Sequence, residues 1–416
     1  MHGRRWLCSI LAVLALTPGC GTASGDDDDA DHDTGVDTPH DAVDTPGEGI
    51  DTPGEAVDTP GEGVDTPGET VDTPGEEATD TTDLDSDSSC APGTGDCNGN
   101  PGDGCEADLT ADTANCGRCG HDCVGGACTA SACQPVAVAG PHTTSTGLHN
   151  GQLALDPTHI YYAYFGTPTG GVEMVGKDGT GATCIACDTG YPRDLVTDGT
   201  SVYWTDQGNN QLRKAPLGGG GTVTTLWSGQ VGRVVAVDAA HVYWWDRAAT
   251  DVMQAGLDGS GATSIATGQP EVGSLAVHSG SLFWTTSTTV MQLDLAGSTL
   301  TTLASGLGEP RSVAADATHV YWAQGPWAGT NTLQRIPRGG GTIELLATAE
   351  TFAIAIDDTH VYVANNHGGT IWRIPKSGGA VEVLATGQPY PWDIELDDVA
   401  AYWSSEGDAT IGKIAK

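Results

Sequence analysis

The chain has 416 residues, with 55 acidic against 16 basic side chains and a formal net charge of −39. Its 60 Gly and 22 Pro exclude a mainly helical protein, because both residue types interrupt helices. The excess negative charge excludes nucleic acid as a partner, because phosphate binding is driven by clustered cations.

Residues 1–19 predict an export signal. Two arginines precede an apolar run from Trp6 to Leu16, which spans about 16 Å as a helix and falls short of the ~30 Å core of a bilayer. The small residue before Cys20 resembles the end of a bacterial lipoprotein signal, and this resemblance implies that Cys20 is lipidated. Ordinary signal cleavage with an incidental Cys20 is the alternative. If Cys20 is lipidated, we expect this lipid alone to attach the protein to the outer membrane or cell surface.

Residues 20–89 predict a disordered acidic tether. The stretch from Asp26 to Asp87 contains 23 carboxylates and neither Lys nor Arg, and the unit Val-Asp-Thr-Pro-Gly-Glu recurs every seven residues. Each unit offers one apolar residue, so no apolar stripe forms and no core offsets the entropy of ordering. We therefore expect a solvated spacer that holds the following domains away from a membrane.

Residues 90–134 form a short, Gly-rich segment with eight cysteines. In an exported chain this composition predicts up to four disulfides, whose pairing the sequence leaves open. A zinc site that uses Cys116 and Cys119 is the alternative. The segment resembles the short Cys-rich modules that precede repeat domains in surface proteins of myxobacterial type. Its cysteines are Cys90, Cys97, Cys105, Cys116, Cys119, Cys123, Cys128 and Cys133.

A loop within this segment alternates oxygen-bearing side chains as a calcium loop does. Pro101 stands where an EF-hand has its turn glycine, and Ala107 stands where it has a bidentate glutamate. We therefore predict Asx turns without a cofactor, and keep calcium as the alternative. The candidate ligands are Asp96, Asn98, Asn100 and Asp103.

An aromatic pair, or a relic of one, recurs seven times in residues 135–416. The second members of successive pairs, which we call second anchors, lie 42, 40, 40, 38, 41 and 40 residues apart. A period near 40 with four strand-like segments per unit is typical of a β-propeller. The fold is therefore predicted to be all-β, with a seven-bladed propeller of four-stranded blades. The pairs are Tyr161-Tyr162, Tyr203-Trp204, Tyr243-Trp244, Phe283-Trp284, Tyr321-Trp322, Tyr362-Val363 and Tyr402-Trp403.

The two ends of this region predict how the ring closes. The last unit stops at Lys416 after its third strand, whereas residues 135–139 precede the first unit and are similar to a fourth strand. We expect this N-terminal strand to complete the final blade, which removes two exposed sheet edges.

The sequence from Tyr203 to Asp206 resembles the YWTD propellers of lipoprotein-receptor type, and the Tyr-Trp pairs with Gly-rich turns resemble TolB-like bacterial propellers. The resemblance covers residues 135–416 and implies a rigid platform that binds proteins or glycans and performs no chemistry.

Four histidines lie three residues before a second anchor, and each follows an Asp by three residues. Equivalent positions in different blades are roughly tens of ångströms apart around a ring, so these residues do not converge on one metal ion. The pattern predicts one Asp-His turn bond per blade. The Asp-His pairs are Asp156 and His159, Asp238 and His241, Asp316 and His319, and Asp357 and His360.

In the first blade, export favours a local disulfide between Cys184 and Cys187 over a redox-active thiol pair.

The position eleven residues before the second anchor breaks the repeat and is expected at the mouth of one face. Its three arginines suit a carboxylate, sulfate or phosphate group, and Trp392 with Tyr390 would stack on a sugar. Salt bridges from the arginines to Asp194, Asp393 or Glu309 are the alternative. In blade order the position reads Gly151, Arg193, Arg233, Gly273, Arg311, Phe352 and Trp392.

These features predict a monomeric surface protein whose propeller binds a protein or an anionic glycan. The sequence contains no nucleophile elbow, no paired histidines of a metalloprotease helix and no phosphate loop. The alternative is a secreted propeller enzyme, a lyase or hydrolase, that acts on an anionic polysaccharide. Acid–base work would then fall to His367 with Glu406 or Tyr390.

Overall fold

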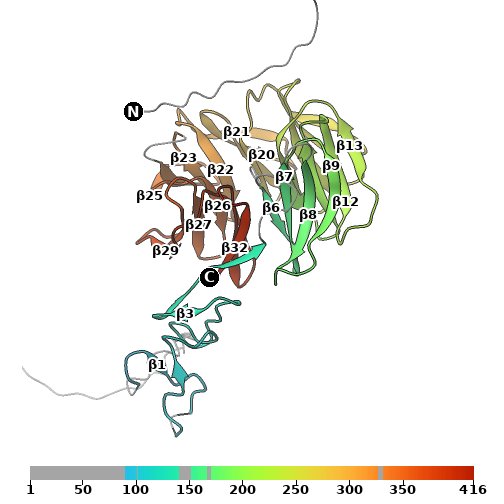
Figure 1. Ribbon diagram of the computed structural model, residues 1–416. Coiled ribbons are helices and arrows are strands. Elements are labelled where there is room, and N and C mark those ends of the chain that lie inside the picture. The colour runs from blue at the N-terminus through green and yellow to red at the C-terminus, as the bar shows by residue number, and fades with distance from the viewer. Residues whose placement is uncertain (1–89, 101, 140–150, 166–169, 327–330) are drawn as a thin grey trace, which may run out of the picture. The chain divides into compact units, whose positions relative to one another are not determined.

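The predicted signal, the lipidated Cys20 and the acidic tether lie outside the residues that the structure describes. All the described residues belong to one compact unit of the chain. Among the described residues, no helix has the length and apolar character needed to cross a bilayer. The computed structural model (Figure 1) describes residues 90–100, 102–139, 151–165, 170–326 and 331–416.

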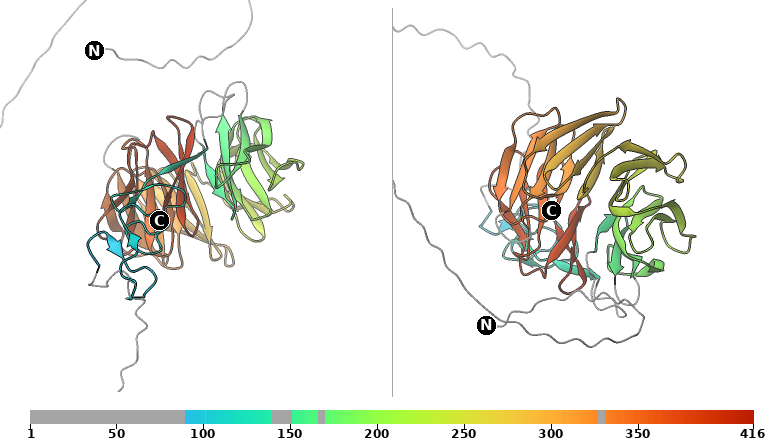
Figure 2. Two further views of the ribbon diagram at one scale, coloured as in Figure 1. Left: turned by 60° about the horizontal axis from the view of Figure 1, so that its bottom comes forward. Right: turned by 90° about the horizontal axis from the view of Figure 1, so that it is seen from above.

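The propeller region folds into seven four-stranded antiparallel sheets, which are arranged around a common axis as blades (Figure 2). The prediction of an all-β, seven-bladed propeller is therefore confirmed. Blade 1 comprises β6 (Leu153–Leu155), β7 (His159–Phe165), β8 (Gly170–Gly176) and β9 (Thr183–Thr189), and blade 2 comprises β10 (Pro192–Thr197), β11 (Ser201–Asp206), β12 (Gln211–Pro216) and β13 (Thr224–Ser228). Blade 3 comprises β14 (Val231–Val237), β15 (His241–Asp246), β16 (Asp251–Gly256) and β17 (Thr263–Ala266), and blade 4 comprises β18 (Ser274–His278), β19 (Ser281–Thr285), β20 (Thr289–Asp294) and β21 (Thr299–Ser305). Blades 5 to 7 comprise β22 (Pro310–Ala315), β23 (His319–Gln324), β24 (Thr332–Pro337), β25 (Glu344–Thr348); β26 (Ala353–Ile356), β27 (His360–Asn365), β28 (Thr370–Pro375), β29 (Glu382–Ala385); and β30 (Pro391–Leu396), β31 (Ala400–Ser405), β32 (Thr410–Ala415), β5 (Val136–Ala139).

Strand β5 closes the ring, as the sequence predicts. It pairs antiparallel with β32 and aligns Ala139 with Ile411. Val138 is buried and packs in one cluster with Tyr162 of blade 1 and Tyr402 of blade 7. The N-terminal strand therefore completes the C-terminal blade and fills the seam between blades 7 and 1.

The aromatic pairs form the core between neighbouring blades. Successive residues of a strand point to opposite faces, so the two members of a pair pack against different neighbours. Tyr203 of blade 2 shares a cluster with Trp244 of blade 3. Tyr243 of blade 3 shares the next cluster with Trp284 of blade 4. All four side chains are at most 1% exposed, and each buried ring stabilises the fold by roughly 2–3 kcal/mol.

An Asp side chain organises the turn between the first and second strands of a blade. In blade 5, Asp316 Oδ1 accepts a hydrogen bond from the backbone N–H of His319 at 2.8 Å, and Oδ2 accepts one from the Tyr321 hydroxyl at 3.0 Å. The predicted Asp-His bond is thus present, but its donor is the backbone amide and not the imidazole. Asp198 and Asp397 make the same bonds in blades 2 and 7, which have no histidine at this position. The turn therefore depends on the carboxylate, and the histidine is dispensable.

The Cys-rich segment is held by four disulfides, as its composition predicts. It contains two hairpins of two-residue strands: β1 (Thr94–Gly95) pairs with β2 (Ala107–Asp108), and β3 (Cys128–Thr129) pairs with β4 (Ala132–Cys133). Cross-links, more than strand pairing, therefore define its structure. The disulfides are Cys90–Cys105, Cys97–Cys119, Cys116–Cys128 and Cys123–Cys133.

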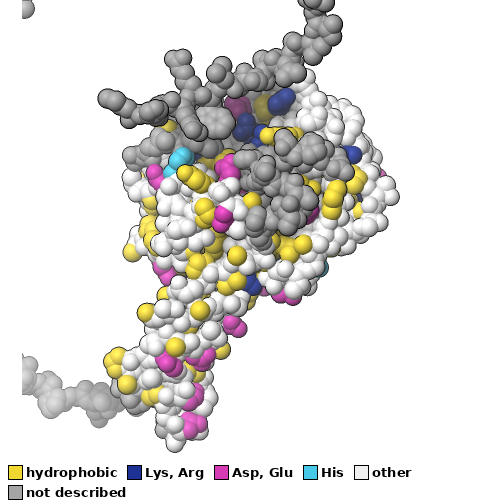
Figure 3. Space-filling model, viewed as in Figure 1, with side chains coloured by type: hydrophobic (Ala, Val, Ile, Leu, Met, Phe, Trp, Pro, Cys, Tyr) yellow, Lys and Arg dark blue, Asp and Glu magenta, His cyan; other side chains and the backbone are white. Residues whose placement is uncertain are grey.

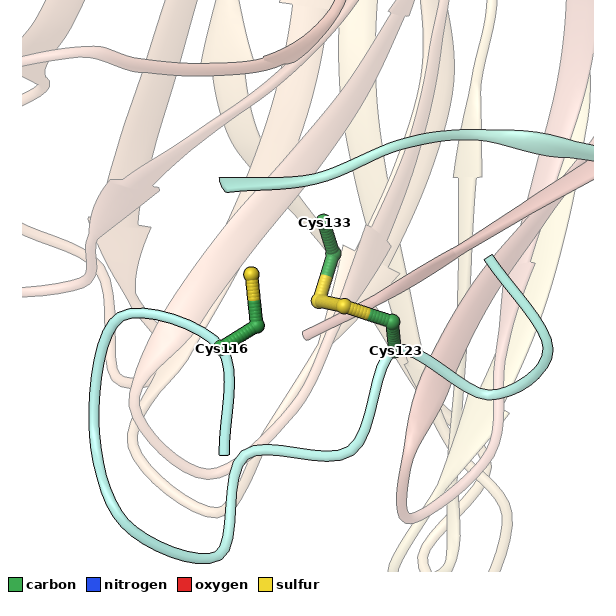
Figure 4. Close-up of side chains that lie close together, drawn as sticks. All are labelled: Cys116, Cys123 and Cys133. Atoms are coloured by element: carbon green, nitrogen blue, oxygen red, sulfur yellow. A yellow bond between two sulfur atoms is a disulfide. The ribbon is translucent and has the colours of Figure 1, made fainter. Parts of the chain in front are cut away.

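Three sulfur atoms lie together in this segment, those of Cys116, Cys123 and Cys133 (Figure 4). Cys123 is bonded to Cys133, and Cys116 is bonded to Cys128, so this group offers no thiolate to a metal. Cys116 and Cys119 belong to two different disulfides. The zinc alternative is therefore wrong for this oxidised segment.

The candidate calcium loop is organised by its own amide groups. Asp96 Oδ1 accepts a hydrogen bond from the Gly99 N–H at 2.8 Å. Asn98 Oδ1 accepts one from the Asn100 N–H at 2.7 Å. Asp103 Oδ2 accepts from the side-chain amides of Asn98 and Asn100, both at 3.1 Å. The oxygens proposed as ligands thus form Asx turns and local amide bonds.

Candidate binding site at the propeller mouth

One end of the propeller, here called the mouth, combines two features of the blades. These are the beginnings of the inner strands and the turns between the second and third strands. The register places Pro192 opposite Asp206 in blade 2, and Pro310 opposite Gln324 in blade 5. The position that breaks the sequence repeat therefore lies at the same end as these turns.

A cavity of about 690 Å³ opens at the mouth and is lined by the inner strands of all seven blades. This volume is within the range of ligand sites, roughly 300–1,000 Å³. Its lining includes Arg233, Arg311, Phe352 and Trp392, four of the residues that the sequence places at the mouth. Figure 3 shows basic side chains gathered in a hollow at the top of the propeller.

Acidic neighbours hold two of the three arginines. Arg311 Nη2 donates to Glu309 Oε2 at 2.9 Å, and its Nε donates to the carbonyl oxygen of Gly325 at 3.0 Å. The rim salt bridge to Glu309 that the sequence offers as an alternative is therefore present. Arg233 lies 3.9 Å from Glu271, and its side chain is 64% exposed. Arg233 thus remains open to an anion from solvent.

Arg193 does not line the cavity, although its neighbour Asp194 does. Its Nε donates to Gln207 Oε1 at 3.2 Å, and its guanidinium lies 4.7 Å from the centre of the Tyr191 ring. Burial lowers the pKa of Arg193, and the positive charge of Arg233 lowers it further. Burial and Arg233 act on the pKa of Arg311 in the same direction. Arg233 thus lies within electrostatic reach of both other arginines, and an anion beside it would relieve this repulsion.

An aromatic pair completes the rim. Phe352 and Trp392 lie with their ring centres 4.5 Å apart and tilted by 51°, and the Arg311 guanidinium lies 5.8 Å from the Phe352 ring centre. Tyr390 is 54% exposed and does not line the cavity. The structure therefore places Phe352 against Trp392 in the cavity lining, whereas Tyr390 lies outside that lining.

Two acids form the next layer of the cavity. Asp194 Oδ2 accepts a hydrogen bond from the backbone N–H of Val235 at 2.8 Å, and Asp393 Oδ2 accepts one from that of Leu153 at 2.8 Å. These bonds join blade 2 to blade 3 and blade 7 to blade 1. Serine hydroxyls make the equivalent bond from blades 4 and 5. The two aspartates therefore bind the backbone of the next blade, and not the arginines that the sequence suggested as partners.

Glu395 lies two residues after Asp393 and faces the same cavity. Burial raises the pKa of Glu395, and the charges of Asp393 and Asp194 raise it further. Burial likewise raises the pKa of Asp194 to about 8. A cationic rim therefore stands above carboxyl groups whose pKa values are raised above their usual range.

The sequence reasoning missed Glu395, although a signal for it was present. Comparing the repeats eight residues before the second anchor shows one Glu among small apolar residues. The other six blades carry Ala154, Val196, Ala236, Ala276, Ala314 and Ala355 there.

The residues of the enzyme alternative lie on the mouth turns of blades 6 and 7. His367 is exposed in the turn after β27. Glu406 follows β31, and its backbone N–H donates to the carbonyl oxygen of Tyr390 at 3.0 Å. None of the three lines the cavity as the described residues define it. The acids that line the cavity are Glu271 and Glu309 at the rim and the buried Asp194, Asp393 and Glu395.

No protein-family model matches this sequence. No curated protein matches it either. Among solved structures, virginiamycin B lyase from Staphylococcus aureus aligns with a TM-score of 0.57 and 13% identity, over 68% of this chain and 98% of that one. The fold is that of a seven-bladed propeller like this lyase.

Two further structures extend the comparison. A streptogramin B lyase structure aligns with a TM-score of 0.56 and 13% identity, over 67% of this chain and 96% of that one. The nidogen/laminin complex matches over 53% of this chain and 90% of that one, with 20% identity and a TM-score of 0.43, too low to support an argument. The two lyases share the propeller fold with this chain but only 13% of its sequence, and a shared fold does not imply a shared site.

Proposed function

We propose that this protein is an exported, non-enzymatic binding protein whose mouth recognises an anionic glycan or the acidic surface of a protein. The observation that supports this proposal is that two guanidinium groups, of Arg233 and Arg311, and the Phe352–Trp392 pair line the cavity, with Arg193 within electrostatic reach of Arg233. Guanidinium groups bind carboxylate and sulfate through two parallel hydrogen bonds. Aromatic rings beside them offer an apolar face to a sugar ring or an apolar side chain.

The location is part of the proposal. The five disulfides are typical of proteins that fold in an oxidising compartment outside the cytosol. We propose in addition that Cys20 carries a lipid and that residues 20–89 tether the folded unit to the outer membrane or cell surface. Labelled palmitate should be incorporated by the full chain and not by a Cys20→Ser variant; equal labelling of both would contradict the anchor.

Calorimetric titration with a uronic-acid polysaccharide, a sulfated polysaccharide and a neutral polysaccharide tests the mouth. We expect the anionic chains to bind, and salt to weaken this binding because exposed charges are screened. Arg311→Ala should weaken it tenfold or more, and Arg311→Lys should restore only part of the loss, because an ammonium group lacks the fork geometry.

Two further variants make this test specific. Trp392→Ala removes the stacking face without changing charge, and should weaken a glycan more than inorganic sulfate. Arg118→Ala removes an exposed cation from the Cys-rich segment and should leave binding unchanged. Equal affinities of the chain and the Arg311→Ala variant, with both folded, would remove the mouth from the proposal.

The buried acids favour one alternative, a lyase or hydrolase that acts on an anionic polysaccharide. In such an enzyme the guanidiniums would neutralise the carboxylate of the sugar, and a protonated carboxyl below them would donate to the leaving oxygen. The solved structures of similar fold include virginiamycin B lyase and a streptogramin B lyase. Glu395→Ala, which restores the residue type of five other blades, should then abolish turnover and preserve binding. Release of unsaturated or reducing ends by the wild-type chain would overturn the binding-only proposal.

A further inference from the structure

Blade 1 departs from the other blades in one row of side chains that crosses three strands. Tyr162 of β7 lies opposite Glu173 of β8, and Glu173 lies opposite Cys184 of β9. Side chains that lie opposite each other on paired strands share a face of the sheet. The position of Tyr162 is Trp in blades 2 to 5 and 7. The position of Glu173 is occupied in blades 2 to 7 by Arg213, Met253, Met291, Gln334, Trp372 and Gly412.

A bulge in β9 brings two cysteines into this row. Val172 pairs with Ala186 and Glu173 with Cys184, so Ile185 is an extra residue. A second register shift follows between Gly170 and Val172, so the alternation of side chains is interrupted on both sides of Ala186, and the disulfide shows that the two cysteine side chains meet. The outer strands of the other blades also carry a register shift, but in the described chain only blade 1 places cysteines there. The predicted local disulfide Cys184–Cys187 is confirmed.

A buried carboxylate stands beside this disulfide. Glu173 is 4% exposed, and one of its oxygens and the two sulfur atoms all lie within 4.8 Å of one another. Tyr162 Oη donates to Glu173 Oε2 at 2.7 Å. Burial raises the pKa of Tyr162, and the hydrogen bond to Glu173 raises it further. The tyrosine thus remains a donor and orients the carboxylate beside the sulfurs.

This disulfide differs from the other four in exposure and in loop length. Cys187 is exposed, whereas the other nine described half-cystines are buried or half-buried. Its two cysteines lie three positions apart in the sequence, whereas those of each disulfide in the Cys-rich segment lie 10 to 22 positions apart. A cross-link that closes so short a loop restricts the unfolded chain little. Stabilisation of the fold therefore accounts poorly for this disulfide, and Cys187 is the exposed residue of the pair.

We propose that Cys184 and Cys187 form a redox-active pair that undergoes thiol–disulfide exchange with external thiols and disulfides, with Glu173 as the proton acceptor for Cys184. In the oxidising direction, the thiolate of Cys187 attacks an external disulfide and forms a mixed disulfide, and one external thiolate leaves. The Cys184 thiol then gives its proton to Glu173, and its sulfur attacks Cys187 Sγ and expels the second external thiolate. Two electrons pass from the protein dithiol to the external disulfide, which leaves as two thiols.

The test uses the full chain with dithiothreitol as reductant and oxidised glutathione as oxidant, followed by acid quenching, alkylation and mass spectrometry of the peptides. We expect Cys184–Cys187 to be reduced first, while the four disulfides of the Cys-rich segment and the fold persist. On return to oxidised glutathione, Glu173→Gln should slow closure of the pair tenfold or more at pH 7. The difference should vanish at high pH, where the thiol ionises without help.

Two controls separate this role from a structural one. Asp178→Asn also changes a carboxylate to an amide in the β8–β9 hairpin, at its exposed turn, and should close at the wild-type rate. Tyr162→Phe removes the hydrogen bond to Glu173 and should slow closure to a smaller extent, and it carries the test if Glu173→Gln does not fold. The proposal is overturned if the pair resists reduction until the propeller unfolds, or if the Glu173 and Tyr162 variants close at the rate of the Asp178 variant.

Discussion

The Cys-rich segment and the propeller are both built from antiparallel strands, but they are stabilised by different means. In the segment, four disulfides join hairpins whose strands are two residues long. Four of its few buried apolar side chains are themselves cysteines. In the propeller, rings such as those of Trp204 and Trp284 are completely buried between blades.

Chain length explains the difference. A segment of about 45 residues cannot bury enough apolar surface to offset its conformational entropy, so covalent cross-links supply what a core would. A repeated 40-residue unit buries little by itself, but stacking seven of them around a ring creates one continuous set of interfaces. The segment should therefore depend on its redox state, and the propeller on the closure of its ring.

The largest expected effect comes from opening the ring. Replacing residues 136–139 by four Gly and Ser residues keeps the chain length but removes Val138 from its cluster and weakens the pairing of β5 with β32. We expect a loss on the order of 3–5 kcal/mol, from the buried side chain and the cross-strand bonds together. Calorimetry should show a melting temperature lower by roughly 10 °C.

A single substitution in the same strand is the control. Ala137 is exposed, and Ala137→Ser should change stability by no more than about 0.5 kcal/mol. If the Gly/Ser variant melts with the wild-type protein, contacts other than β5 close the ring, and the contrast between the two regions loses its basis.

Reduction should affect the two regions unequally. Loss of a native disulfide costs a small domain roughly 2–5 kcal/mol, so a strong reductant should unfold residues 90–134 and expose them to protease. The described part of the propeller contains one disulfide, the short-loop Cys184–Cys187, and should keep its melting temperature within a few degrees. Limited proteolysis with mass spectrometry and calorimetry on the same sample measure both effects. A propeller transition that falls together with the segment would show one cooperative unit.

Much of the fold could be predicted because the aromatic pairs recur at a regular spacing, which shows where each blade begins. The spacing of the aromatic pairs predicts the blade count, and the strand missing after Lys416 predicts that residues 136–139 complete blade 7. The disulfide pairing could not be predicted, because the segment has no repeat and eight cysteines constrain one another only in three dimensions.

The site was predicted less completely, for a geometrical reason. The position that breaks the repeat leads to Arg233, Arg311 and Trp392, which line the cavity. It does not show that Phe352, from the preceding blade, packs against Trp392, because neighbours around the ring are about 40 residues apart in the chain. The aromatic spacing also marks Glu395 as a break in the repeat, but it does not show that this position faces the cavity, because that depends on strand register.

The two regions also differ in how they hold their acids, and this leads to the smallest expected effect. In the Cys-rich segment, a hydrogen bond from the Thr110 side chain lowers the pKa of the exposed Asp108. In the propeller cavity, burial raises the pKa of Asp194 to about 8 and that of Asp393 to about 7. The stability that acids such as Asp108 provide is lost only as the pH falls below about 4. The cavity acids, in contrast, change the stability of the fold at pH values above about 4.

The sign of the cavity effect follows from proton binding. Between a pH of about 4, where an unfolded aspartate titrates, and about 8, where Asp194 titrates in the folded state, the Asp194 carboxyl binds more protons in the folded protein than in the unfolded chain. The lowered pKa of His360 acts in the opposite direction at one group, against the two aspartates of the cavity. Stability must therefore fall as the pH rises through this window. We expect the melting temperature of the propeller to be a few degrees lower at pH 8 than at pH 5.

The variant Asp194→Asn tests whether the cavity acids cause this fall in stability with rising pH. The amide oxygen can still accept the hydrogen bond from Val235, but the side chain no longer ionises, so the difference between pH 5 and pH 8 should shrink. Asp108→Asn, in the Cys-rich segment, should leave the difference unchanged because that carboxyl is ionised at both values. A wild-type melting temperature that is flat or rises from pH 5 to pH 8 would mean that the cavity acids are hydrated and ionised in the folded state. The cationic rim would then stand above a negatively charged floor, and an anionic ligand could not extend below Arg233 and Arg311 without electrostatic repulsion.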